Sequence, residues 1–302
     1  MKYVILDLEW DTVYYPPQKR FVNQILQIGA VKLDENFNKL DTLELNIKSQ
    51  ISKKVSKRFT DITGITTEDM LSGIPLYEAV EKYNTFVKDT QVAMTWSDTD
   101  LYTILDNQKV LLKEKVTFSF DKYLDLQKLV QGEMQRKGYE SKNQVSLESA
   151  AQFFKIDTKK FEFHTALDDS LVCGELLKAT FNKDRFNELL KDTKNPEFFA
   201  RLRFKARPIS NIKDEAIDKK HLEFRCPECN AQAKNVSKWK YHNRWFSANF
   251  KCAHCGFKFN GRVSFKRTYD EVLVKRRICE YRVKKNDMQS MSKEVQLTSN
   301  RN

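Results

Sequence analysis

The sequence lacks the features that would place it in a membrane or outside the cell. It contains no run of about eighteen apolar residues, the length needed to cross a bilayer. Its N-terminus reaches Asp7 too early for a secretory signal. It has only six cysteines in 302 residues, and four of them form two C-x-x-C pairs, which is typical of metal binding rather than disulfides. We therefore expect a cytoplasmic protein with no membrane partner.

Charge is unevenly distributed along the chain. The net charge is +12, and residues 198–302 contain 25 Lys and Arg against 10 Asp and Glu, whereas the first 197 residues carry a net charge of −3. A near-neutral part joined to a basic part indicates that one carries out chemistry and the other grips a polyanion. A solvated, lysine-rich surface is the alternative that charge alone leaves open.

The apolar pattern predicts a mixed α/β domain in the first part of the chain. Strands are expected at residues 2–9, 25–34, 40–48, 92–96 and 123–126, and helices at residues 76–87, 166–179 and 183–192 and from residues 100 and 146. Strands first, followed by alternating strands and helices, indicate a sheet covered by helices.

An acidic pair lies on the first predicted strand. Asp7 and Glu9 are two residues apart, so their side chains point to the same face. Two buried carboxylates repel each other unless a cation or a proton lies between them. On its own the pattern is weak, because such pairs are more often exposed at the end of a strand.

Two further polar elements follow at helix starts. Asp98 and Asp100 lie where the strand at residues 92–96 meets a helix, a position where Asp also serves as an N-cap. His164 precedes Asp168 and Asp169 at the start of a late helix. Alone, such a histidine is more often a hydrogen-bonded surface or core residue than a catalyst.

Taken together, D-x-E on the first strand, Asp at a strand-to-helix junction and H-x₄-D on a late helix resemble the DEDDh exonuclease family. The resemblance covers roughly residues 1–182, including the ITGIT turn (Ile62 to Thr66) and the SLESAAQFF helix (Ser146 to Phe154). It is closest to the branch of the sporulation inhibitor KapD and the RNA-interference-regulating exonucleases. It implies an α/β, ribonuclease-H-like fold, in which a mixed five-stranded sheet of order 3-2-1-4-5 is flanked by helices.

The resemblance also implies an activity, a metal-dependent 3′-to-5′ exonuclease acting on single-stranded nucleic acid, with RNA slightly favoured over DNA. It assigns two Mg²⁺ or Mn²⁺ ions to four carboxylates and the role of general base to a histidine, namely Asp7, Glu9, Asp100, Asp169 and His164. Hard cations prefer oxygen ligands, and an imidazole can take the proton from an attacking water.

Three positions in this assignment carry alternatives. Asp98 competes with Asp100, and Asp168 with Asp169; the family pattern selects Asp100 and Asp169. Trp10, directly after Glu9, is either a stacking partner for the terminal base or a core residue.

The paired cysteines predict one structural zinc site. Cys226 and Cys229 form one C-x-x-C pair, and Cys252 and Cys255 form the second, 22 residues further along. Two such turns complete a tetrahedral site with four thiolates, which is closed and therefore structural. The glycine at position 256 suits the tight turn after the second pair, because glycine accepts a positive φ. This resembles a zinc ribbon.

The predicted ribbon is rich in cations and aromatic residues. Residues 230–269 contain nine Lys or Arg and no Asp or Glu. Cations follow phosphates and exposed aromatic rings stack on bases, although about half of the rings must form the ribbon's own core. The candidate nucleic-acid-binding residues here are Lys238, Trp239, Lys240, Tyr241, Arg244 and Trp245. The aromatic residues could instead dock on a protein partner such as a ribosome or polymerase component.

We expect four segments: an exonuclease domain at residues 1–196, a basic linker at 197–220, a small β-rich zinc ribbon domain at 221–270 and a basic, partly disordered tail at 271–302. The alternative function is a nucleic-acid-binding or ribosome- or polymerase-associated protein with an inactive nuclease fold. All five motif positions carry usable side chains, which counts against inactivity.

Overall fold

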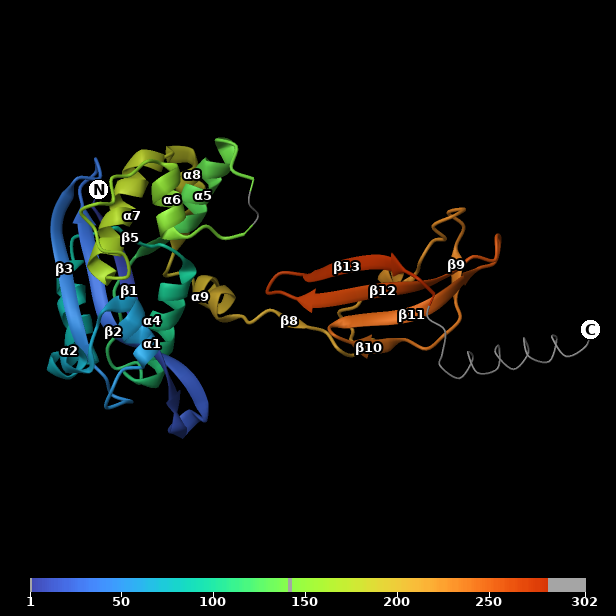
Figure 1. The fold of residues 1–302 in the computed structure, drawn as a ribbon, viewed down its shortest axis with the longest axis horizontal. Coiled ribbons are helices and arrows are strands. Elements are labelled where there is room, and N and C mark those ends of the chain that lie inside the picture. The colour runs from blue at the N-terminus through green and yellow to red at the C-terminus, as the bar shows by residue number, and fades with distance from the viewer. Residues whose placement is uncertain (1, 141–142, 282–302) are drawn as a thin grey trace, which may run out of the picture. The chain divides into compact units, whose positions relative to one another are not determined.

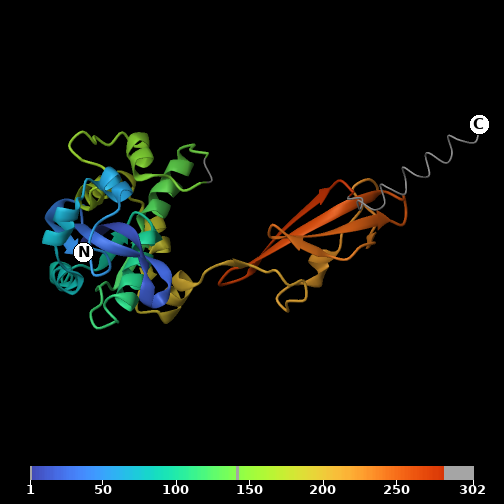
Figure 2. The ribbon, with the colours of Figure 1, turned by 60° about the horizontal axis from the view of Figure 1, so that its bottom comes forward.

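The computed structural model describes residues 2–140 and 143–281. The chain forms two compact units, unit 1 (Met1–Arg203) and unit 2 (Phe204–Asn302). Unit 1 contains a sheet with helices around it, whereas unit 2 consists mainly of strands (Figures 1 and 2). Among the described residues, no helix is both long and apolar enough to span a membrane.

Unit 1 begins with three strands and continues with strands and helices in alternation. Its strands are β1 (Tyr3–Tyr15), β2 (Arg20–Leu33), β3 (Lys39–Lys48), β4 (Ile74–Pro75), β5 (Val92–Thr95), β6 (Lys122–Asp125) and β7 (Lys191–Asp192). Its helices are η1 (Pro16–Gln18), α1 (Lys57–Thr63), α2 (Thr67–Ser72), α3 (Leu76–Phe86), α4 (Asp98–Val110), α5 (Leu126–Arg136), α6 (Leu147–Phe153), α7 (Ala166–Thr180), α8 (Lys183–Leu189) and α9 (Pro196–Arg203).

The sheet of unit 1 has the strand order β4-β3-β2-β1-β5-β6-β7. Its five central strands follow the predicted order 3-2-1-4-5, and the α/β, ribonuclease-H-like fold class is confirmed. Two edge strands of two residues each were not predicted, because so short a segment has no period to recognise. The strand β1 is central and pairs antiparallel with β2 and parallel with β5.

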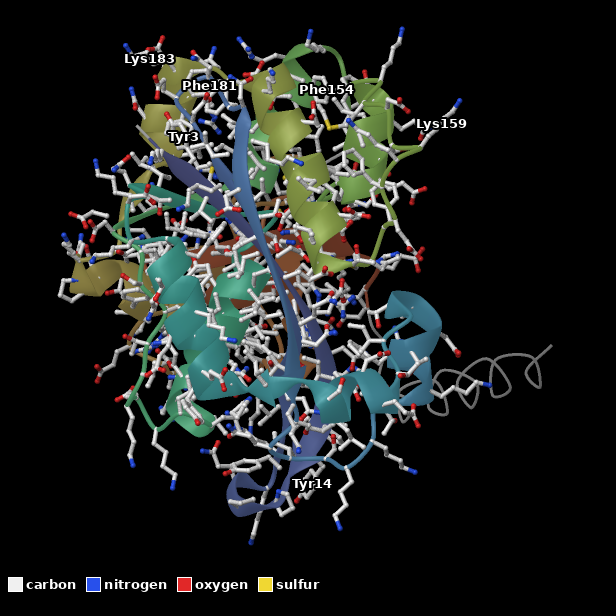
Figure 3. All side chains as sticks on the ribbon, turned by 90° about the vertical axis from the view of Figure 1, so that its left-hand side faces the viewer. Tyr3, Tyr14, Phe154, Lys159, Phe181 and Lys183 are labelled. Carbon is white, nitrogen blue, oxygen red and sulfur yellow. The ribbon has the colours of Figure 1, made fainter. Side chains whose placement is uncertain are left out.

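Alternate residues of β1 enter two different cores, because a central strand is covered on both faces. Ile5 packs with apolar residues of α5, α6 and α7, while Val4 and Leu6 pack with those of α3 and α4. The strand runs the length of the unit, and Figure 3 shows Tyr14 far from Tyr3 along it. This places the middle of β1, where Asp7 and Glu9 lie, between two helical layers.

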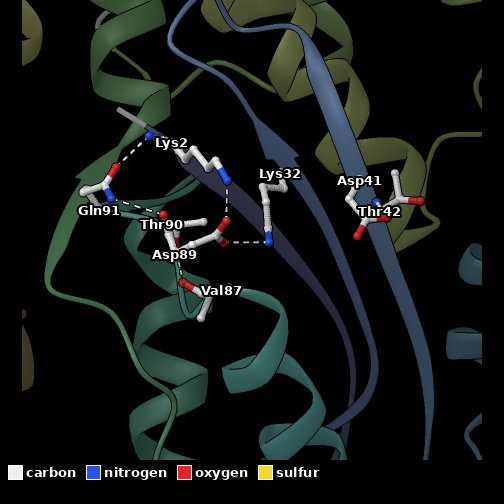
Figure 4. Close-up of polar contacts among 8 residues, drawn as sticks. All are labelled: Lys2, Lys32, Asp41, Thr42, Val87, Asp89, Thr90 and Gln91. Carbon is white, nitrogen blue, oxygen red and sulfur yellow. Dashed lines mark hydrogen bonds and ion pairs between the residues drawn. The ribbon is translucent and has the colours of Figure 1, made fainter.

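A polar contact ties the edges of these elements together near the start of β1. Asp89, after α3, accepts hydrogen bonds from Lys2 and from Lys32 of β2, and Gln91 accepts one from the backbone N–H of Lys2 (Figure 4). The two lysines hold the pKa of Asp89 far below its usual range. Because Asp89 and Lys2 are exposed, solvent screens these pairs and they add little to stability.

Unit 2 is built around one antiparallel sheet. Its elements are β8 (Arg207–Pro208), η2 (Lys219–Leu222), β9 (Ala233–Asn235), β10 (Lys240–His242), β11 (Trp245–Cys252), β12 (Lys258–Arg267) and β13 (Val272–Cys279). The strand order is β10-β11-β12-β13, with β9 on β11 and β8 on β12. Phe246, Phe250, Phe259 and Phe265 are buried on one face of this sheet, which forms the core of the unit.

Two of the expected segments differ from the observed elements. The expected tail from residue 271 begins with β13, a full strand of the sheet in which Val274 pairs with Phe265. The expected linker at 197–220 contains most of α9, where Phe198 packs on the Tyr123 ring, and also β8. In both segments the many cations hid a short apolar pattern. The expected disorder at 282–302 lies outside the described residues.

Candidate metal centre and cysteine cluster

Asp7 and Glu9 lie on the central strand β1 and face the same side of the sheet. On β2, Gly29 is paired with Asp7 and Gln27 is paired with Glu9. Both carboxylates are half-buried. The pair is therefore held in the middle of the sheet, not at the exposed strand end that was the alternative.

Helix α7 delivers Asp169 to the same place by resting directly on the backbone of β2. A Cβ atom at Gly29 would lie 2.1 Å from the carbonyl carbon of Ala166, so only glycine allows this contact. The Ser170 hydroxyl donates to the carbonyl oxygen of Gly29 at 3.1 Å, and the N–H of Ala166 donates to Oε1 of Gln27 at 3.1 Å. These contacts fix the first turn of α7, and with it Asp169, against β1.

Three of the predicted ligands form a close group. One carboxylate oxygen from each of Asp7, Glu9 and Asp169 lies within 4.8 Å of those of the other two. Burial, together with the charges of Asp169 and Asp100, raises the pKa of Glu9 to about 8. Burial likewise raises the pKa of Asp7 well above its usual range, with the charges of Asp100, Asp169 and Glu9 acting in the same direction. The cluster is therefore electrostatically unfavourable when it holds no cation.

Asp100 belongs to the same electrostatic cluster, although it is not in the 4.8 Å group. It is the third residue of α4, it is 4% exposed, and burial raises its pKa to about 7. Its Oδ1 and that of Asp169 are both buried without a hydrogen-bond partner among the described residues. A buried carboxylate oxygen without a partner is costly, so each of these atoms is a ligand position that a cation would satisfy.

The competing carboxylates at both registers have other partners. Asp98 begins α4 at the surface, and its carboxylate lies 3.7 Å from the ammonium of Lys128. Asp168 accepts a hydrogen bond of 2.7 Å from the N–H of Glu162. By contrast, Asp100 is buried with an Oδ1 that has no hydrogen-bond partner among the described residues, and Asp169 belongs to the group of three close carboxylates. The geometry thus favours Asp100 and Asp169 over their neighbours.

His164 lies in the loop that leads into α7. It is exposed and has a φ of 69°, which is uncommon for a residue other than glycine. Thr165 caps α7 by accepting from the N–H of Asp168 at 3.4 Å, and its hydroxyl donates to the carbonyl oxygen of Glu162. Burial raises the pKa of Asp169 to about 6, while the charge of His164 acts to lower it. The backbone N–H of His164 acts to lower the same pKa, so His164 lies next to Asp169 in the chain's fold.

Trp10 follows the cluster on β1, just past an irregularity in the β1–β2 pairing between Glu9 and Trp10. It is half-buried and packs against the core beneath α3 and α4. This contact favours the core alternative for Trp10.

Gly29 and Gln27 are the positioning residues that the sequence analysis missed. The sequence analysis treated Gly29 only as a member of the strand predicted at residues 25–34. An isolated glycine inside a strand often marks a close backbone approach, and that was the available signal. Gln27 gave no such signal, because nothing in the sequence links it to a helix that starts 139 residues later.

The four paired cysteines converge in unit 2. Their sulfur atoms form one group within 4.8 Å, with 3.5 Å between Cys226 and Cys255, Cys229 and Cys252, and Cys229 and Cys255. Four sulfurs around a zinc ion at 2.3 Å would be separated by about 3.8 Å, so the group is compatible with zinc. The four thiols share their protons unevenly: the N–H groups of Cys255 and His254 lower the pKa of Cys252 to about 6, whereas the pKa values of Cys229 and Cys255 are raised.

The two cysteine turns share one backbone geometry. The N–H of Asn230 donates to the carbonyl oxygen of Cys226 at 3.0 Å, and that of Gly256 donates to Cys252 at 3.1 Å. Asn230 and Gly256, each four residues after the first cysteine of a pair, have φ values of 57° and 72°. The positive φ that the sequence predicted for Gly256 is thus present.

The predicted nucleic-acid-binding residues of unit 2 do not lie on one surface, because some are exposed and others pack in the core. Lys238 is exposed in the segment between β9 and β10, Arg244 is exposed in the turn between β10 and β11, and Lys240 is exposed on β10. Trp239 was proposed as a base-stacking residue, but it packs beside the Phe224 and Phe250 rings and belongs to the core.

Tyr241 lies on the core side of the sheet, with its ring 4.8 Å from that of Phe246. Trp245 points to the opposite side, because it neighbours the buried Phe246 on the same strand. Of the three aromatic candidates, only Trp245 therefore lies on the face away from the core.

Comparison with known proteins agrees with this architecture. The sequence model described as Exonuclease (RNase T) matches residues 4–177, more than half of the chain. The chain belongs to the exonuclease family. Enzymes of this family are nucleases that use divalent metal ions, and the oxygen donors of Asp7, Glu9, Asp100 and Asp169 fit such ions. The match ends before unit 2 of the chain.

Curated relatives of this chain include the PolC-type DNA polymerase III of Thermotoga petrophila, which is 27% identical over 190 residues. The alignment covers 63% of this chain and 12% of the polymerase, so the chain spans a small part of the length of that relative. The corresponding polymerase of Thermotoga maritima matches to the same extent.

Solved structures similar to this chain share the fold of its first unit at low identity. One is the nuclease domain of 3′hExo, a DEDDh family member, bound to rAMP; it is 18% identical, with a TM-score of 0.50, and the match covers 59% of this chain and 90% of that one. Another is a 3′-exonuclease that recognises the 3′ end of a histone mRNA stem-loop, 16% identical, with a TM-score of 0.50 and 59% and 80% coverage.

Proposed function

We propose that the chain is a 3′-to-5′ exonuclease of the DEDDh type that removes nucleotides from the 3′ end of single-stranded nucleic acid, RNA ahead of DNA. The observation that carries the proposal is the pair of buried, unpartnered oxygens of Asp100 and Asp169 beside Asp7 and Glu9. Four carboxylates at this depth repel one another, and hard divalent cations would offset that cost.

In this proposal Asp7, Glu9, Asp100 and Asp169 hold two Mg²⁺ or Mn²⁺ ions. When bound, such ions supply Lewis acidity at the scissile phosphate and stabilise charge on the departing 3′-oxygen. The protein contributes by fixing the four carboxylates on three elements, β1, α4 and α7, before substrate arrives. Preorganised charge of this kind requires no rearrangement during the reaction.

His164 is the general base of the proposal. It accepts a proton from the attacking water at an imidazole nitrogen, and its exposed position leaves that nitrogen open to solvent and substrate. The φ of 69° places this loop in a conformation that the capping of α7 by Thr165 maintains. The strained backbone thereby sets the position of the imidazole relative to Asp169.

We further propose that unit 2 is a zinc ribbon that assists substrate binding. The four cysteine sulfurs would hold one structural Zn²⁺ ion, and the matched turns at Asn230 and Gly256 support this assignment. A site closed by four thiolates leaves no ligand position for catalysis, so the contribution of unit 2 would be affinity for the strand.

A time course on a 5′-labelled strand tests the proposal. RNA and DNA of one sequence are incubated with Mg²⁺, Mn²⁺ or no added divalent ion, with the Asp7→Asn variant as control. The expected result is a ladder that shortens from the 3′ end only when a divalent ion is present, and that the variant does not produce. Cleavage of neither strand, with binding retained, would identify a nucleic-acid-binding protein with an inactive nuclease fold.

The same assay shows whether the preferred substrate is RNA or DNA. The RNA preference rests on the resemblance to the RNA-trimming branch that includes KapD, whereas a PolC-type DNA polymerase is among the relatives. Faster shortening of the RNA ladder supports the proposed substrate, and faster shortening of the DNA ladder replaces it.

A further inference from the structure

The sheet of unit 2 has one face that its core does not use. Residues paired across antiparallel strands point to the same face, and Phe250 with Phe259 marks the core side. The neighbouring pair, Lys251 with Lys258, therefore points to the opposite side, which we call the outer face. Both lysines are exposed.

A row of three lysines crosses the outer face at one end. Lys234 on β9 is paired with Lys251 on β11, and Lys251 is paired on its other side with Lys258 on β12. All three are exposed. Like charges placed directly opposite each other on a sheet destabilise it, and here the arrangement occurs twice in succession.

A second cationic row crosses the same face four residues away along β11. This row crosses four neighbouring strands. Lys240 on β10 is paired with Ser247 on β11. Ser247 is paired on its other side with Arg262 on β12, and Arg262 is paired with Arg277 on β13. Arg262 and Arg277 thus form another directly opposed like-charge pair. At about 3.4 Å per residue, the two rows are roughly 14 Å apart, a length that a few nucleotides of extended strand would cover.

An aromatic platform accompanies the second row. The Arg277 guanidinium lies 3.8 Å from the centre of the Trp245 ring, and that of Arg262 lies 5.7 Å from it. The Nε atom of Arg262 is buried without a hydrogen-bond partner in the described part of the chain. Indole and guanidinium planes are the groups on which unpaired bases stack.

No carboxylate balances this face. The five strands β9 to β13 contain no Asp or Glu. Among the described ion pairs, none involves the six cations of the two rows, Lys234, Lys240, Lys251, Lys258, Arg262 and Arg277. An extended anion lying across both rows would relieve the opposed charges of each.

We propose that the outer face of unit 2 binds a single-stranded nucleic acid, with the two rows on its phosphates and a base stacked at Trp245. That the ligand is single-stranded nucleic acid rests on the proposed function. That the ligand is an anion follows from the positive charges of the two rows. The proposal moves the binding surface away from Trp239 and Tyr241 to a face set by strand register.

Binding without cleavage tests the surface. The full chain with Asp7→Asn is titrated with a fluorescein-labelled RNA or DNA strand of about 16 nucleotides, over a range of salt concentrations. One variant adds Lys234→Ala, Lys251→Ala and Lys258→Ala. A matched variant adds Lys213→Ala, Lys219→Ala and Lys220→Ala, which removes equal charge from exposed positions of unit 2 outside strands β8 to β13. Zinc content and thermal unfolding check that both variants fold.

The first variant is expected to reduce the slope of log K against log salt by about 2, since each phosphate contact of a single strand contributes about 0.7. The matched variant keeps the parental slope. Trp245→Leu weakens binding by about tenfold and leaves the slope unchanged, because stacking releases no counterions.

Equal slopes for the two triple variants overturn the proposal, and so does a parent chain that binds neither strand at about 50 mM salt, which would leave the face to an acidic protein partner. These outcomes are separate from the nuclease assay. Binding as predicted without cleavage refutes the proposed function alone, and cleavage with unchanged slopes refutes the surface alone.

Discussion

Both units of the protein gather charges of one sign, but they do so in opposite surroundings. Unit 1 brings carboxylates from β1, α4 and α7 into its interior, where burial turns their repulsion into raised pKa values. Unit 2 spreads lysines and arginines over an exposed sheet, where water screens them. A small hard ion fits the first arrangement and an extended anion fits the second. The depth of the charges therefore distinguishes the kind of ligand.

The largest expected effect is the loss of folding in unit 2 alone when its zinc site is removed. Replacing Cys226 and Cys229 with Ser should abolish the folding of unit 2, because structural zinc contributes roughly 10–16 kcal/mol in small domains. Calorimetry should show the loss of one transition, with the transition of unit 1 retained. Cys279→Ser is the control, since Cys279 lies on β13 and is not a member of the cysteine cluster. A zinc content unchanged in the double variant would contradict the four-cysteine site.

The next effect concerns the contact that assembles the carboxylates. Gly29→Ala should destabilise unit 1 by about 3 kcal/mol or more, because the new methyl group collides with the α7 backbone. Gly132→Ala is the matched control, since its Cβ would meet only the Arg185 side chain at 3.6 Å and helix α5 should gain up to about 1 kcal/mol. Urea unfolding measures both. Equal stability of the two variants would show that α7 does not need the close approach.

A neutral replacement in the cluster should move activity and stability in opposite directions. Asp100→Asn is expected to reduce cleavage more than about a hundredfold, or about 2.7 kcal/mol, because a metal ligand is lost. Without added divalent ions its melting temperature should rise, because one buried charge is removed. Thermal unfolding and the nuclease assay are run on the same preparation. A lower melting temperature would mean that Asp100 already has a favourable partner.

The smallest effect is a pH dependence confined to unit 1. The pKa values of Asp169, Asp100 and Glu9 are raised to about 6, 7 and 8. The folded state therefore keeps protons that the unfolded state releases, and stability falls as pH rises from about 4 to 8.

Without divalent ions, the melting temperature of unit 1 should fall over this range. Adding Mg²⁺ should raise it more at pH 8 than at pH 5.5. A melting temperature that rises with pH in that window, or Mg²⁺ stabilisation that is equal at both values, would argue against the carboxylate cluster.

The chemistry-bearing residues could be predicted because they depend on short-range patterns, whereas the order of the central strands was implied by the family resemblance that those residues carry. D-x-E on a strand, an Asp at a helix start and paired C-x-x-C turns each involve fewer than ten neighbouring residues. The register between Asp98 and Asp100 needed the family pattern, since both are acidic residues in the first turn of α4.

The contacts between distant elements could not be predicted in the same way. The hydrogen bond from Ala166 to Gln27 and the fit of α7 on Gly29 depend on tertiary packing that no local period reports. Register also decided which aromatic rings of unit 2 face outward. Trp239 and Trp245 have similar sequence surroundings, but Trp239 packs beside the core rings of Phe224 and Phe250, whereas its place in β11 puts Trp245 on the other face.

The docking of α7 on Gly29 also has a consequence for the order in which the protein acquires its parts during synthesis. Asp7 and Glu9 leave the ribosome more than 150 residues before Ala166 and Asp169, which are made only near the end of unit 1. Because a long chain segment must be closed before this contact can form, it belongs to the late steps of folding. A partly synthesised chain therefore carries an incomplete set of metal ligands. The proposed nuclease is inactive until all of unit 1 has been synthesised.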